Sequence, residues 1–381
     1  MTVVRTLPTQ EAQALLGLTR DLVDGELLPQ VAEAEASGRF PRELFRELGR
    51  AGLLGLPYPQ EQGGGGQPYE VYLQVLEELG RGWAAVAVSV SVHTLACFPV
   101  AQWGSAQQQE RFLPGMLGGD LLGAYCLSEA QSGSDAAALS TRAVRDGDNY
   151  VVDGAKAWVT HGGHADFYNL MVRTGGPGPG GISCLLADSD TPGMVAQPPE
   201  RKMGMRSSPT ASMLLTNARV PADRLLALEG EGFRIAMSAL DSGRLGIAAC
   251  AVGLAQAALD VAADYARTRR QFGKAIADFQ GVSFMLADMA TQVEAARALY
   301  LAAARLKDAG RPYATQASMA KLFATDTAMR VTTDAVQVLG GYGYVEDFPA
   351  ERFLREAKIM QIFEGTNQVQ RVVIGRALTR A

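Results

Sequence analysis

Residues that bind metals or form disulfides are scarce in this 381-residue chain, which has three histidines and four cysteines. The cysteines lie far apart and form no CxxC pair, so we expect buried free thiols rather than a zinc site or a disulfide framework. His161 and His164 flank two glycines, a spacing that loops place poorly for metal coordination. With so few histidines no Ser-His-Asp constellation is visible, and no Gly-x-Ser-x-Gly elbow occurs. The sequence therefore predicts neither a metal enzyme nor a serine hydrolase.

An excess of positive charge is also lacking: 35 basic residues stand against 40 acidic ones, for a formal net charge of −5. Nucleic acids and anionic membranes usually require a basic surface, so such partners are disfavoured. The most apolar stretch, residues 84–101, is interrupted by Ser89, Ser91, His93 and Pro99 and predicts a buried helix rather than a membrane span. The first eight residues lack the pattern of a secretory signal. We expect a folded, cytoplasmic protein with no nucleic acid and no membrane partner.

The chain has 42 glycines but no Rossmann fingerprint. Gly63 to Gly66 are preceded by no strand pattern and followed by no Lys-Ser/Thr pair, which indicates a connector rather than a phosphate loop. A dinucleotide, if one is bound, must be held in another way.

Apolar periodicity divides the chain into three parts. From Thr9 to about Gly119 the spacing is helical, as in PRELFRELGRAGLLG, where Pro41 suits the first helical position, and in YEVYLQVLEELGRG, which we expect to close at Gly80. Between about residues 121 and 228, short alternating runs separated by turn dipeptides predict an antiparallel β unit. From Gly232 onward helical spacing returns in alanine-rich segments. One apolar stripe there consists of Leu245, Ala248, Val252, Ala255, Leu259 and Ala262.

This order predicts a mostly α chain with a central β domain. We expect an N-terminal helical domain over residues 1–120, an antiparallel middle β domain over residues 121–230 and a C-terminal helical bundle over residues 231–381.

Glu364 is the acidic residue of the stretch IFEGTNQVQR, with apolar side chains before it and Gly365 after it. An apolar setting raises the pKa of a carboxyl and strengthens the carboxylate as a base, and glycine allows close approach of the backbone to a ligand. Thr366 is placed to cap a helix through residues 369–378, whose free amides would favour an anion such as a pyrophosphate. The alternative is a glutamate that only interacts with the helix dipole.

The stretch YCLSEAQSGSD, residues 125–135, opens the β unit with hydroxyls and small residues. Ser128, Ser132 and Ser134, with neighbouring backbone amides, are suited to cradle a polar ligand edge or a phosphate. An ordinary Ser/Gly turn is the other interpretation, and the stretch by itself leaves both open.

Several stretches together resemble the acyl-CoA dehydrogenase family over nearly the whole chain. They are YCLSEAQSGSD, AWVTHGG, KMGMRSSPT, RRQFGKAIADFQ, VLGGYGYVEDFPAERFLREAKI and IFEGTNQVQR, in the family's order and at its spacings. The region GYGYVEDFPAER is similar to the short-chain, butyryl-type members. The three-part organisation also resembles the family's fold, which ends in a four-helix bundle. The resemblance implies an FAD-dependent oxidoreductase that converts an acyl-CoA thioester, preferably with a short or branched chain, to a trans-2-enoyl-CoA.

The same resemblance implies FAD held in a cleft between the β domain and the bundle. Residues that match the family's FAD contacts are Tyr125, Leu127, Ser128, Ser134, Trp158, Val159, Thr160, Arg269, Phe272, Gln280, Gln337, Gly340, Gly341, Thr366 and Gln368. Arg269 and Phe272 match positions that reach the FAD of a neighbouring subunit. The adenosine side of this shared site is matched by Gln280, Gln337, Gly340 and Gly341. A site completed by a second chain implies an oligomer, typically a homotetramer.

By the resemblance, Glu364 is the catalytic base, which removes the α-proton of the thioester while the β-hydrogen leaves as hydride to flavin N5. The backbone amide of Glu364 and a ribityl hydroxyl are the expected donors to the thioester oxygen. Residues that match substrate-binding positions are Ser134, Asp241, Arg244 and Gly365. Electron-transferring flavoprotein is the expected electron acceptor. Some relatives carry the base on a bundle helix, where this chain has Gly243, so Glu364 stands at the alternative position.

Two departures from the family concern the flavin side. Ala130, Gln131 and Ser132 follow Glu129 where the family usually has Pro-Gly-x, and His161 stands where asparagine is common. The first is expected to alter the shape of the loop, and the second to alter the polarity close to the ring.

Two other functions remain open on the same fold. A flavin oxidase of the nitroalkane type carries aspartate at the base position, and Glu364 argues against it. A non-catalytic, DNA-associated relative would need a basic C-terminal surface. Acidic residues that dilute the basic ones there are Glu346, Asp347, Glu351 and Glu356.

Overall fold

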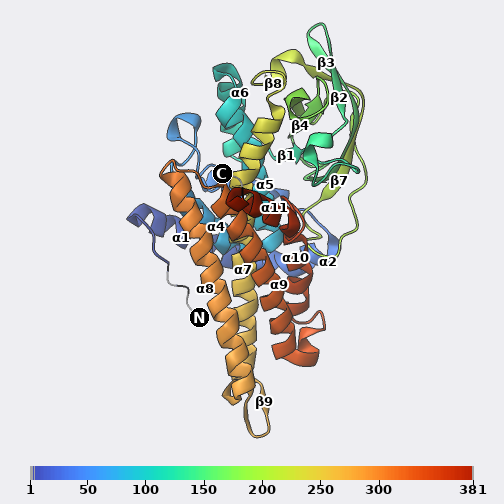
Figure 1. The fold of residues 1–381 in the computed structure, drawn as a ribbon. Coiled ribbons are helices and arrows are strands. Elements are labelled where there is room, and N and C mark those ends of the chain that lie inside the picture. The colour runs from blue at the N-terminus through green and yellow to red at the C-terminus, as the bar shows by residue number, and fades with distance from the viewer. Residues whose placement is uncertain (1–2, 4, 380–381) are drawn as a thin grey trace.

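The computed structural model describes residues 3 and 5–379. A β domain lies at one end of an elongated molecule, the long helices of the C-terminal part form the other end, and the N-terminal helices pack beside both (Figure 1). This arrangement confirms the expected fold class of a central β domain between two helical parts.

The N-terminal part is helical, as the spacing predicts. Its helices are α1 (Gln10–Leu22), α2 (Val31–Ser37), α3 (Arg42–Arg50), α4 (Tyr69–Gly82), α5 (Ala84–Trp103) and α6 (Ala106–Leu117). The expected end of α4 at Gly80 is wrong, because the helix continues to Gly82. A Cβ on Gly80 would lie 2.9 Å from the Cys250 carbonyl oxygen, so this glycine serves close helix packing rather than termination.

Helix α5 is a core helix, as expected for residues 84–101. By length and composition, α5 and the bundle helix α7 (Gly232–Thr268) could each cross a bilayer. However, 94% and 89% of their most apolar windows are buried inside the fold. Apolar helices of this length are common in the cores of large proteins, so the two helices are weak evidence for a membrane span.

The middle part is one twisted sheet and a few short turns. Its strands are β1 (Gly123–Cys126), β2 (Arg142–Asp146), β3 (Asn149–Thr160), β4 (Phe167–Arg173), β5 (Ile182–Asp188), β6 (Met194–Ala196), β7 (Thr210–Pro221) and β8 (Leu225–Leu226). The path runs β6-β7-β3-β2-β4-β5-β8, with β1 paired to β4. Most pairs are antiparallel, as predicted, but β1 and β2 each meet β4 in parallel, so the sheet is mixed. The alternation of apolar residues, on which the prediction rested, does not encode strand direction.

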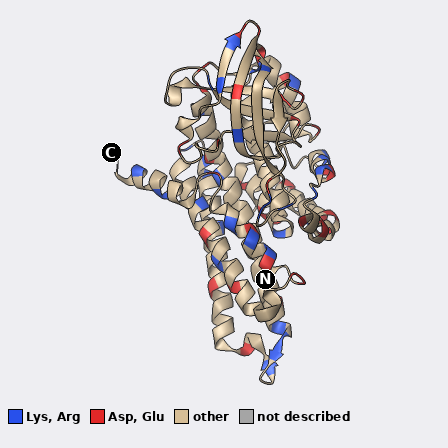
Figure 2. Ribbon diagram, turned by 90° about the vertical axis from the view of Figure 1, so that its right-hand side faces the viewer, with Lys and Arg blue, Asp and Glu red and all other residues tan. Residues whose placement is uncertain are grey.

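The C-terminal part contains α7, α8 (Gln280–Asp308), α9 (Ala314–Leu339), α10 (Ala350–Met360) and α11 (Asn367–Thr379). The predicted alanine-rich stripe of α7 is buried throughout. A short hairpin of β9 (Arg270–Gln271) and β10 (Lys274–Ala275) joins α7 to α8 at the end remote from the β domain. Helix α11 extends away from the bundle (Figure 2).

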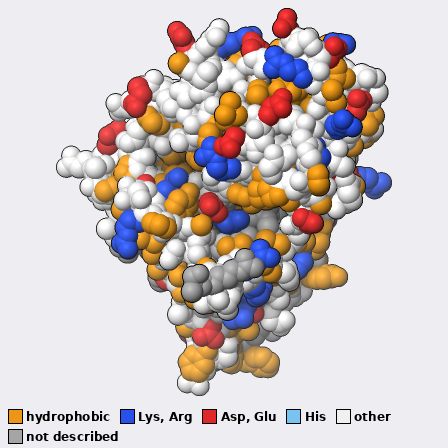
Figure 3. Space-filling view, turned by 45° about the horizontal axis from the view of Figure 1, so that its top comes forward, with side chains coloured by type: hydrophobic (Ala, Val, Ile, Leu, Met, Phe, Trp, Pro, Cys, Tyr) orange, Lys and Arg blue, Asp and Glu red, His pale blue; other side chains and the backbone are white. Residues whose placement is uncertain are grey.

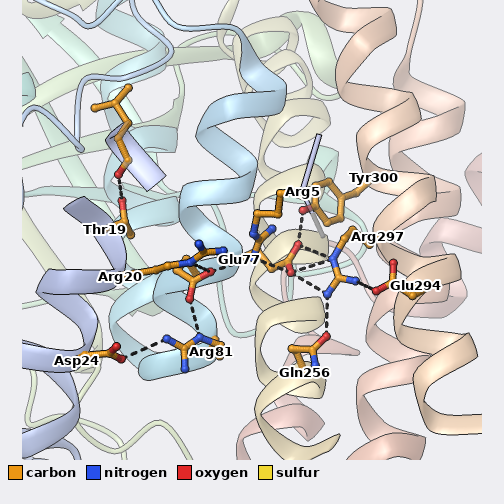
Figure 4. Close-up of polar contacts among 12 residues, drawn as sticks. Arg5, Thr19, Arg20, Asp24, Glu77, Arg81, Gln256, Glu294, Arg297 and Tyr300 are labelled. Atoms are coloured by element: carbon orange, nitrogen blue, oxygen red, sulfur yellow. Dashed lines mark hydrogen bonds and ion pairs between the residues drawn. The ribbon is translucent and has the colours of Figure 1, made fainter. Parts of the chain in front are cut away.

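A buried ionic cluster joins the N-terminal helices to the bundle (Figure 4). Glu77 of α4 accepts hydrogen bonds from Arg5 at 3.0 Å, from Arg297 of α8 at 3.0 Å and from the Tyr300 hydroxyl. Arg297 also donates to Gln256 of α7 at 2.9 Å. Burial alone would raise the pKa of Glu77, but the two guanidinium groups outweigh burial and lower it. The cluster therefore fixes α4 against α7 and α8, the helices that also flank the candidate site.

The outer surface carries charges of both signs, interspersed over the face seen in Figure 3. Glu356 of α10, which the sequence predicts to be a surface charge of the C-terminal part, is buried. Burial raises its pKa to about 8, against the opposing effect of Arg352. Glu346, Asp347 and Glu351, together with the net charge of −5, still disfavour a basic C-terminal surface.

Candidate active site

Glu364 lies in the tight turn between α10 and α11. Its φ of 50° and that of Gly365, 85°, place two successive residues in the left-handed region. A non-glycine residue in this region costs of order 1–3 kcal/mol and persists only where the surrounding structure holds it, and such strain concentrates at functional sites. Thr366 accepts a hydrogen bond from the Val369 amide at 3.1 Å, so the predicted cap of the C-terminal helix is confirmed.

Both carboxylate oxygens of Glu364 are shielded from solvent, and within residues 3 and 5–379 neither has a hydrogen-bond partner. Burial raises the pKa of this carboxyl to about 7, although Lys321 and Arg244 oppose the effect. The predicted rise is therefore confirmed. A carboxylate with a pKa near the working pH and no partner is suited to accept a proton from a ligand.

A narrow cleft adjoins this carboxylate between α4, α5 and α7. Its lining combines aromatic rings with a few hydroxyls: Tyr58, Tyr69, Tyr72, Ser91, Thr94, Leu95, Phe98, Ser242, Gly243 and Lys307 are among the residues that form it. Tyr69 and Tyr72 are close enough to Glu364 for its charge to raise their pKa values further, after burial. An aliphatic chain placed here would meet mostly carbon atoms and little water.

Gly243 of α7 forms the wall beside the carboxylate. A Cβ at this position would lie only 2.3 Å from Glu364 Oε2 and 3.3 Å from Leu95 Cδ1. Some relatives carry the base at position 243. A side chain at that position would thus occupy the same space as the Glu364 carboxylate. Only a glycine leaves room there for the Glu364 side chain.

We expect Gly243→Ala to lower turnover roughly 100-fold, because a displacement of about 1 Å at the reacting centre can cost that much. Helix stability should not fall for intrinsic reasons, since alanine is the better helix former. Steady-state kinetics and cofactor content measure the effect. Gly375→Ala on α11 is the matched control, because a Cβ there meets nothing within 4 Å. Unchanged turnover in Gly243→Ala would show that the carboxylate can move without loss.

Arg244 and Asp241 lie on α7 next to Gly243. Arg244 Nη1 donates to Asp241 Oδ1 at 2.5 Å and lies 3.4 Å from the Ser318 hydroxyl of α9. Arg244 Nε is buried and has no partner in the part of the chain that the structure describes. The structure thus brings together Glu364, Gly365, Arg244 and Asp241 of the residues matched by sequence. Ser134 belongs to the β domain, on the exposed loop after β1.

A second group lies on the neighbouring edge of the β domain. Tyr125 of β1 and the Trp158–Thr160 end of β3 come together there, and the Ala157 amide donates to the Ser128 carbonyl at 2.9 Å. Trp158 has a left-handed φ of 60° at a bulge in the β3–β7 pairing, and 64% of its surface is exposed. The Tyr125 hydroxyl is buried and unpartnered within the described residues, and the charge of Glu364 reaches it. An exposed indole and a buried hydroxyl without a described partner, both at this edge, fit a flat ligand with polar edges, such as a flavin ring.

A buried ion pair holds this edge in shape. Lys156 of β3 donates to Glu129 Oε1 at 2.8 Å, and both side chains are fully buried. The other Glu129 oxygen accepts from the Ser140 amide at 2.7 Å. Burial alone would raise the pKa of Glu129, but Lys156 and these hydrogen bonds lower it to about 2. The loop after β1 is thereby tied to the strand that carries Trp158.

The structure shows what the residues that depart from the family pattern contact. Gln131 bonds to Glu129 and to Ser140, each at 2.8 Å, and the Ser132 hydroxyl donates to the Asp135 carbonyl at 2.6 Å, so both side chains stabilise the loop itself. His161 is buried and bonds to the Gly123 carbonyl at 2.8 Å. Its ring packs on Phe45, with centroids 5.8 Å apart, within the protein core.

A third group of matched residues lies far from the first two. Arg269 and Phe272 belong to the hairpin at the remote end of the bundle, where Phe272 is 94% exposed. Arg269 stacks over Tyr342 at 5.7 Å, which places it beside Gly340 and Gly341. Gln280 and Gln337 are exposed at the same end. Lys321, beneath Glu364, and Leu339 are separated by 18 positions of α9, or roughly 27 Å of helix.

Sequence reasoning missed several residues that surround Glu364. Tyr69, Tyr72 and Leu95 come from the N-terminal helices and gave no signal beyond apolar periodicity. Lys321 gave one, because it is a lone cation on the buried face of α9 among small residues.

Family models match three parts of the chain. Acyl-CoA dehydrogenase N-terminal, middle and C-terminal domain models cover residues 9–120, 124–218 and 230–379. An acyl-CoA dehydrogenase from Bacillus subtilis is 44% identical over 372 residues, covering 97% of this chain and 98% of that protein. Butyryl-CoA dehydrogenase from Megasphaera elsdenii has a TM-score of 0.96 at 42% identity, covering 99% of this chain and 100% of that chain.

A solved structure described as the electron transferring flavoprotein of Acidaminococcus fermentans also contains a similar chain. Its TM-score is 0.97 at 42% identity, and the match covers 99% of this chain and 100% of that one. Full-length similarity of this kind, together with a shielded glutamate carboxylate that faces an apolar cleft and has no partner among the described residues, identifies the chain as a member of the acyl-CoA dehydrogenase family.

Proposed function

We propose that Glu364 is the catalytic base of an FAD-dependent dehydrogenation in which an acyl-CoA thioester becomes a trans-2-enoyl-CoA. The observation that carries the proposal is the Glu364 carboxylate itself, which is shielded from water, lacks a partner among the described residues and has a pKa raised to about 7 by burial. Such a group takes the proton from the carbon next to the thioester carbonyl. When bound, FAD supplies the acceptor for the hydride that leaves the neighbouring carbon.

The turn also offers a donor for the thioester oxygen. Within the described residues, the Glu364 amide donates to no backbone or side-chain acceptor. A free amide beside the base can stabilise negative charge on the thioester oxygen as the proton leaves. Asp241, Arg244 and Gly365 are the proposed contacts of the CoA portion, since they flank the mouth of the cleft on α7 and the turn. Ser134 is the proposed contact from the β domain.

FAD is proposed to lie between the β domain and the bundle. Tyr125, Leu127, Ser128 and Ser134 and the Trp158–Thr160 strand end would face the ring and ribityl chain, with Thr366 and Gln368 at the start of α11. Water is kept from this region by the aromatic lining of the cleft, which keeps the base in its high-pKa environment.

We propose a homotetramer in which the remote group completes the FAD site of a neighbouring subunit. Arg269, Phe272, Gln280, Gln337 and Gly340–Gly341 lie too far along the bundle to join the Trp158 group of their own chain. The 94% exposure of Phe272 supports burial against a partner. The proposed domain limits are residues 1–120, 121–230 and 231–381.

Electron-transferring flavoprotein is the proposed electron acceptor, which the Acidaminococcus fermentans match supports. A cytoplasmic location is proposed, and burial of the two long apolar helices within the fold supports it.

A thioester with a short or branched acyl chain is the proposed substrate. Large side chains such as Tyr69, Tyr72 and Phe98 line the cleft, and a butyryl-CoA dehydrogenase is among the proteins similar to this chain.

Anaerobic titration of the purified holoprotein with butyryl-, isovaleryl-, octanoyl- and palmitoyl-CoA tests the proposal. Bleaching of the flavin absorbance at equivalent concentrations is expected with the first two and not with the last. Bleaching by palmitoyl-CoA alone would overturn the proposed chain length. Absence of bleaching with every thioester, in protein that contains FAD, would contradict the proposed reaction.

A further inference from the structure

A buried lysine lies directly beneath the turn that carries Glu364. Lys321 is fully buried on α9, where its neighbours on the same face are small residues such as Ala317, Ala320 and Ala324. Its Nζ donates to the Gly365 carbonyl and to Asn367 Oδ1, both at 2.9 Å. The ammonium therefore touches the residue directly after the proposed base.

Burying this charge is unfavourable, and no ion pair among residues 3 and 5–379 relieves it. Burial lowers the pKa of Lys321 to about 8, against the opposing effects of Glu364 and Asp326. No carboxylate in the described part of the chain lies within salt-bridge distance of its Nζ, whose acceptors are a neutral carbonyl and an amide. A methionine would fill the same space without the desolvation penalty. A buried charge that is unfavourable for stability indicates a role beyond packing.

The hydrogen bonds of Lys321 secure the strained part of the turn. Gly365 follows Glu364 in the left-handed region, and its carbonyl also accepts from Gln370 Nε2 at 3.0 Å. Asn367, the second acceptor of Lys321, donates to Asp326 Oδ1 at 2.7 Å. Helix α9 thus holds the turn from below through Lys321, Thr325 and Asp326. Gln370 holds it from α11.

We propose that Lys321 is a positioning residue that fixes the Glu364 turn and, through its charge, keeps the Glu364 carboxylate ionised near neutral pH. The inference rests on the proposed role of Glu364 as the base. Lys321 does not touch the reacting atoms; it acts through the Gly365 carbonyl and through the electric field at the carboxylate.

The other groups that face Glu364 do not replace this charge. Arg244 is the second cation near the carboxylate, but it is paired with Asp241, which offsets part of its field. The remaining titratable neighbours of Glu364 are neutral at pH 7 because burial raises their pKa values, and they are Tyr69, Tyr72, Tyr125 and Cys250. Lys321 itself faces Glu364, Asp326 and Arg244.

The test compares Lys321→Met, Lys321→Gln and Lys321→Arg in the FAD-containing protein, with the exposed Lys358→Met as control. We expect Lys321→Met to move the acidic limb of the pH profile of kcat/KM upward by about one unit, the low end of the effect of a nearby opposite charge. From a parent pKa of about 7, such a shift lowers the ionised fraction at pH 7 roughly fivefold. Lys321→Arg, which keeps the charge, should retain the parental limb even if its turnover falls.

A measurement without the cofactor separates this inference from the assignment of the base. The carboxyl infrared band of Glu364 can be followed with pH in apoprotein, as the difference from Glu364→Gln, and should titrate about one unit higher in Lys321→Met. An unchanged Glu364 titration and pH limb in Lys321→Met would reduce Lys321 to a packing residue and overturn the inference. If Lys321→Met fails to fold, Lys321→Gln, which keeps a donor without the charge, decides on the same criteria. Retained turnover in Glu364→Gln is a different failure, since it would remove the base itself.

Discussion

Glu364→Gln is expected to lower turnover of an acyl-CoA thioester by about 10²–10⁴-fold, the usual contribution of a positioned base. Glutamine keeps the size of the side chain and its place beside Gly243, but it cannot take up a proton at neutral pH. The FAD content should stay at the parental level, because the proposed flavin contacts lie on other side chains. Anaerobic mixing with butyryl-CoA, followed by the bleaching of flavin absorbance, measures the loss.

The pH profile gives this experiment a second readout. Because burial raises the pKa of Glu364 to about 7, the parent should gain activity as the pH rises through 7 and level off above it. The glutamine variant should lack this limb. Glu110→Gln, an exposed change on α6, is the matched control and should behave as the parent. Turnover of Glu364→Gln within a few-fold of the parent would contradict the role of Glu364 as the base.

Local patterns in the sequence predict most of the fold. The helical spacing of α5 and α7, the stripe from Leu245 to Ala262 and the cap at Thr366 all depend on residues near in sequence, so they can be recognised without the tertiary structure. The end of α4 could not be recognised in this way. A glycine is needed at position 80 because of close contact with Cys250 of α7, which is far away in the chain. The parallel pairing of β1 with β4 could not be predicted for the same reason, because the partner and direction of a strand are properties of the assembled sheet.

Some features of the candidate site could likewise be predicted from the sequence, and others could not. The sequence predicts the raised pKa of Glu364 from the apolar Ile362 and Phe363, but Ile362 is 49% exposed. The carboxylate is instead buried against α7 and α5. That the carboxylate has no partner among the described residues could not be predicted, because this depends on Gly243 and Leu95, contributed by α7 and α5. The family resemblance matched Arg269 and Phe272 to the FAD of a neighbouring subunit but gave no distances. The structure adds that their hairpin lies at the end of the bundle remote from the β domain.

Lys156→Met is expected to destabilise the protein by about 3–5 kcal/mol, because it leaves the Glu129 carboxylate buried without its counter-charge. The pair is fully buried and 2.8 Å apart, so solvent screening does not diminish it. The Leu127 carbonyl would also lose a donor, at 3.3 Å, and the loop after β1 would be less firmly tied to β3. Denaturant unfolding measures the loss of stability, and equilibrium dialysis should show weaker retention of FAD. Lys358→Met, on the surface of α10, should change neither quantity.

The double variant Glu129→Gln/Lys156→Met distinguishes a stranded charge from a lost contact. Removing both charges takes away the unpaired carboxylate, so the double variant should be more stable than Lys156→Met alone. Acid titration adds an independent check: since the pKa of Glu129 is lowered to about 2 in the folded protein, the parent keeps the stabilisation from this pair at neutral pH and loses it as the pH falls from about 4.5 toward 2. The double variant should lack that component of acid sensitivity. If the single and double variants are equally unstable, the penalty comes from packing around Lys156, and the pair does not hold the edge of the β domain electrostatically.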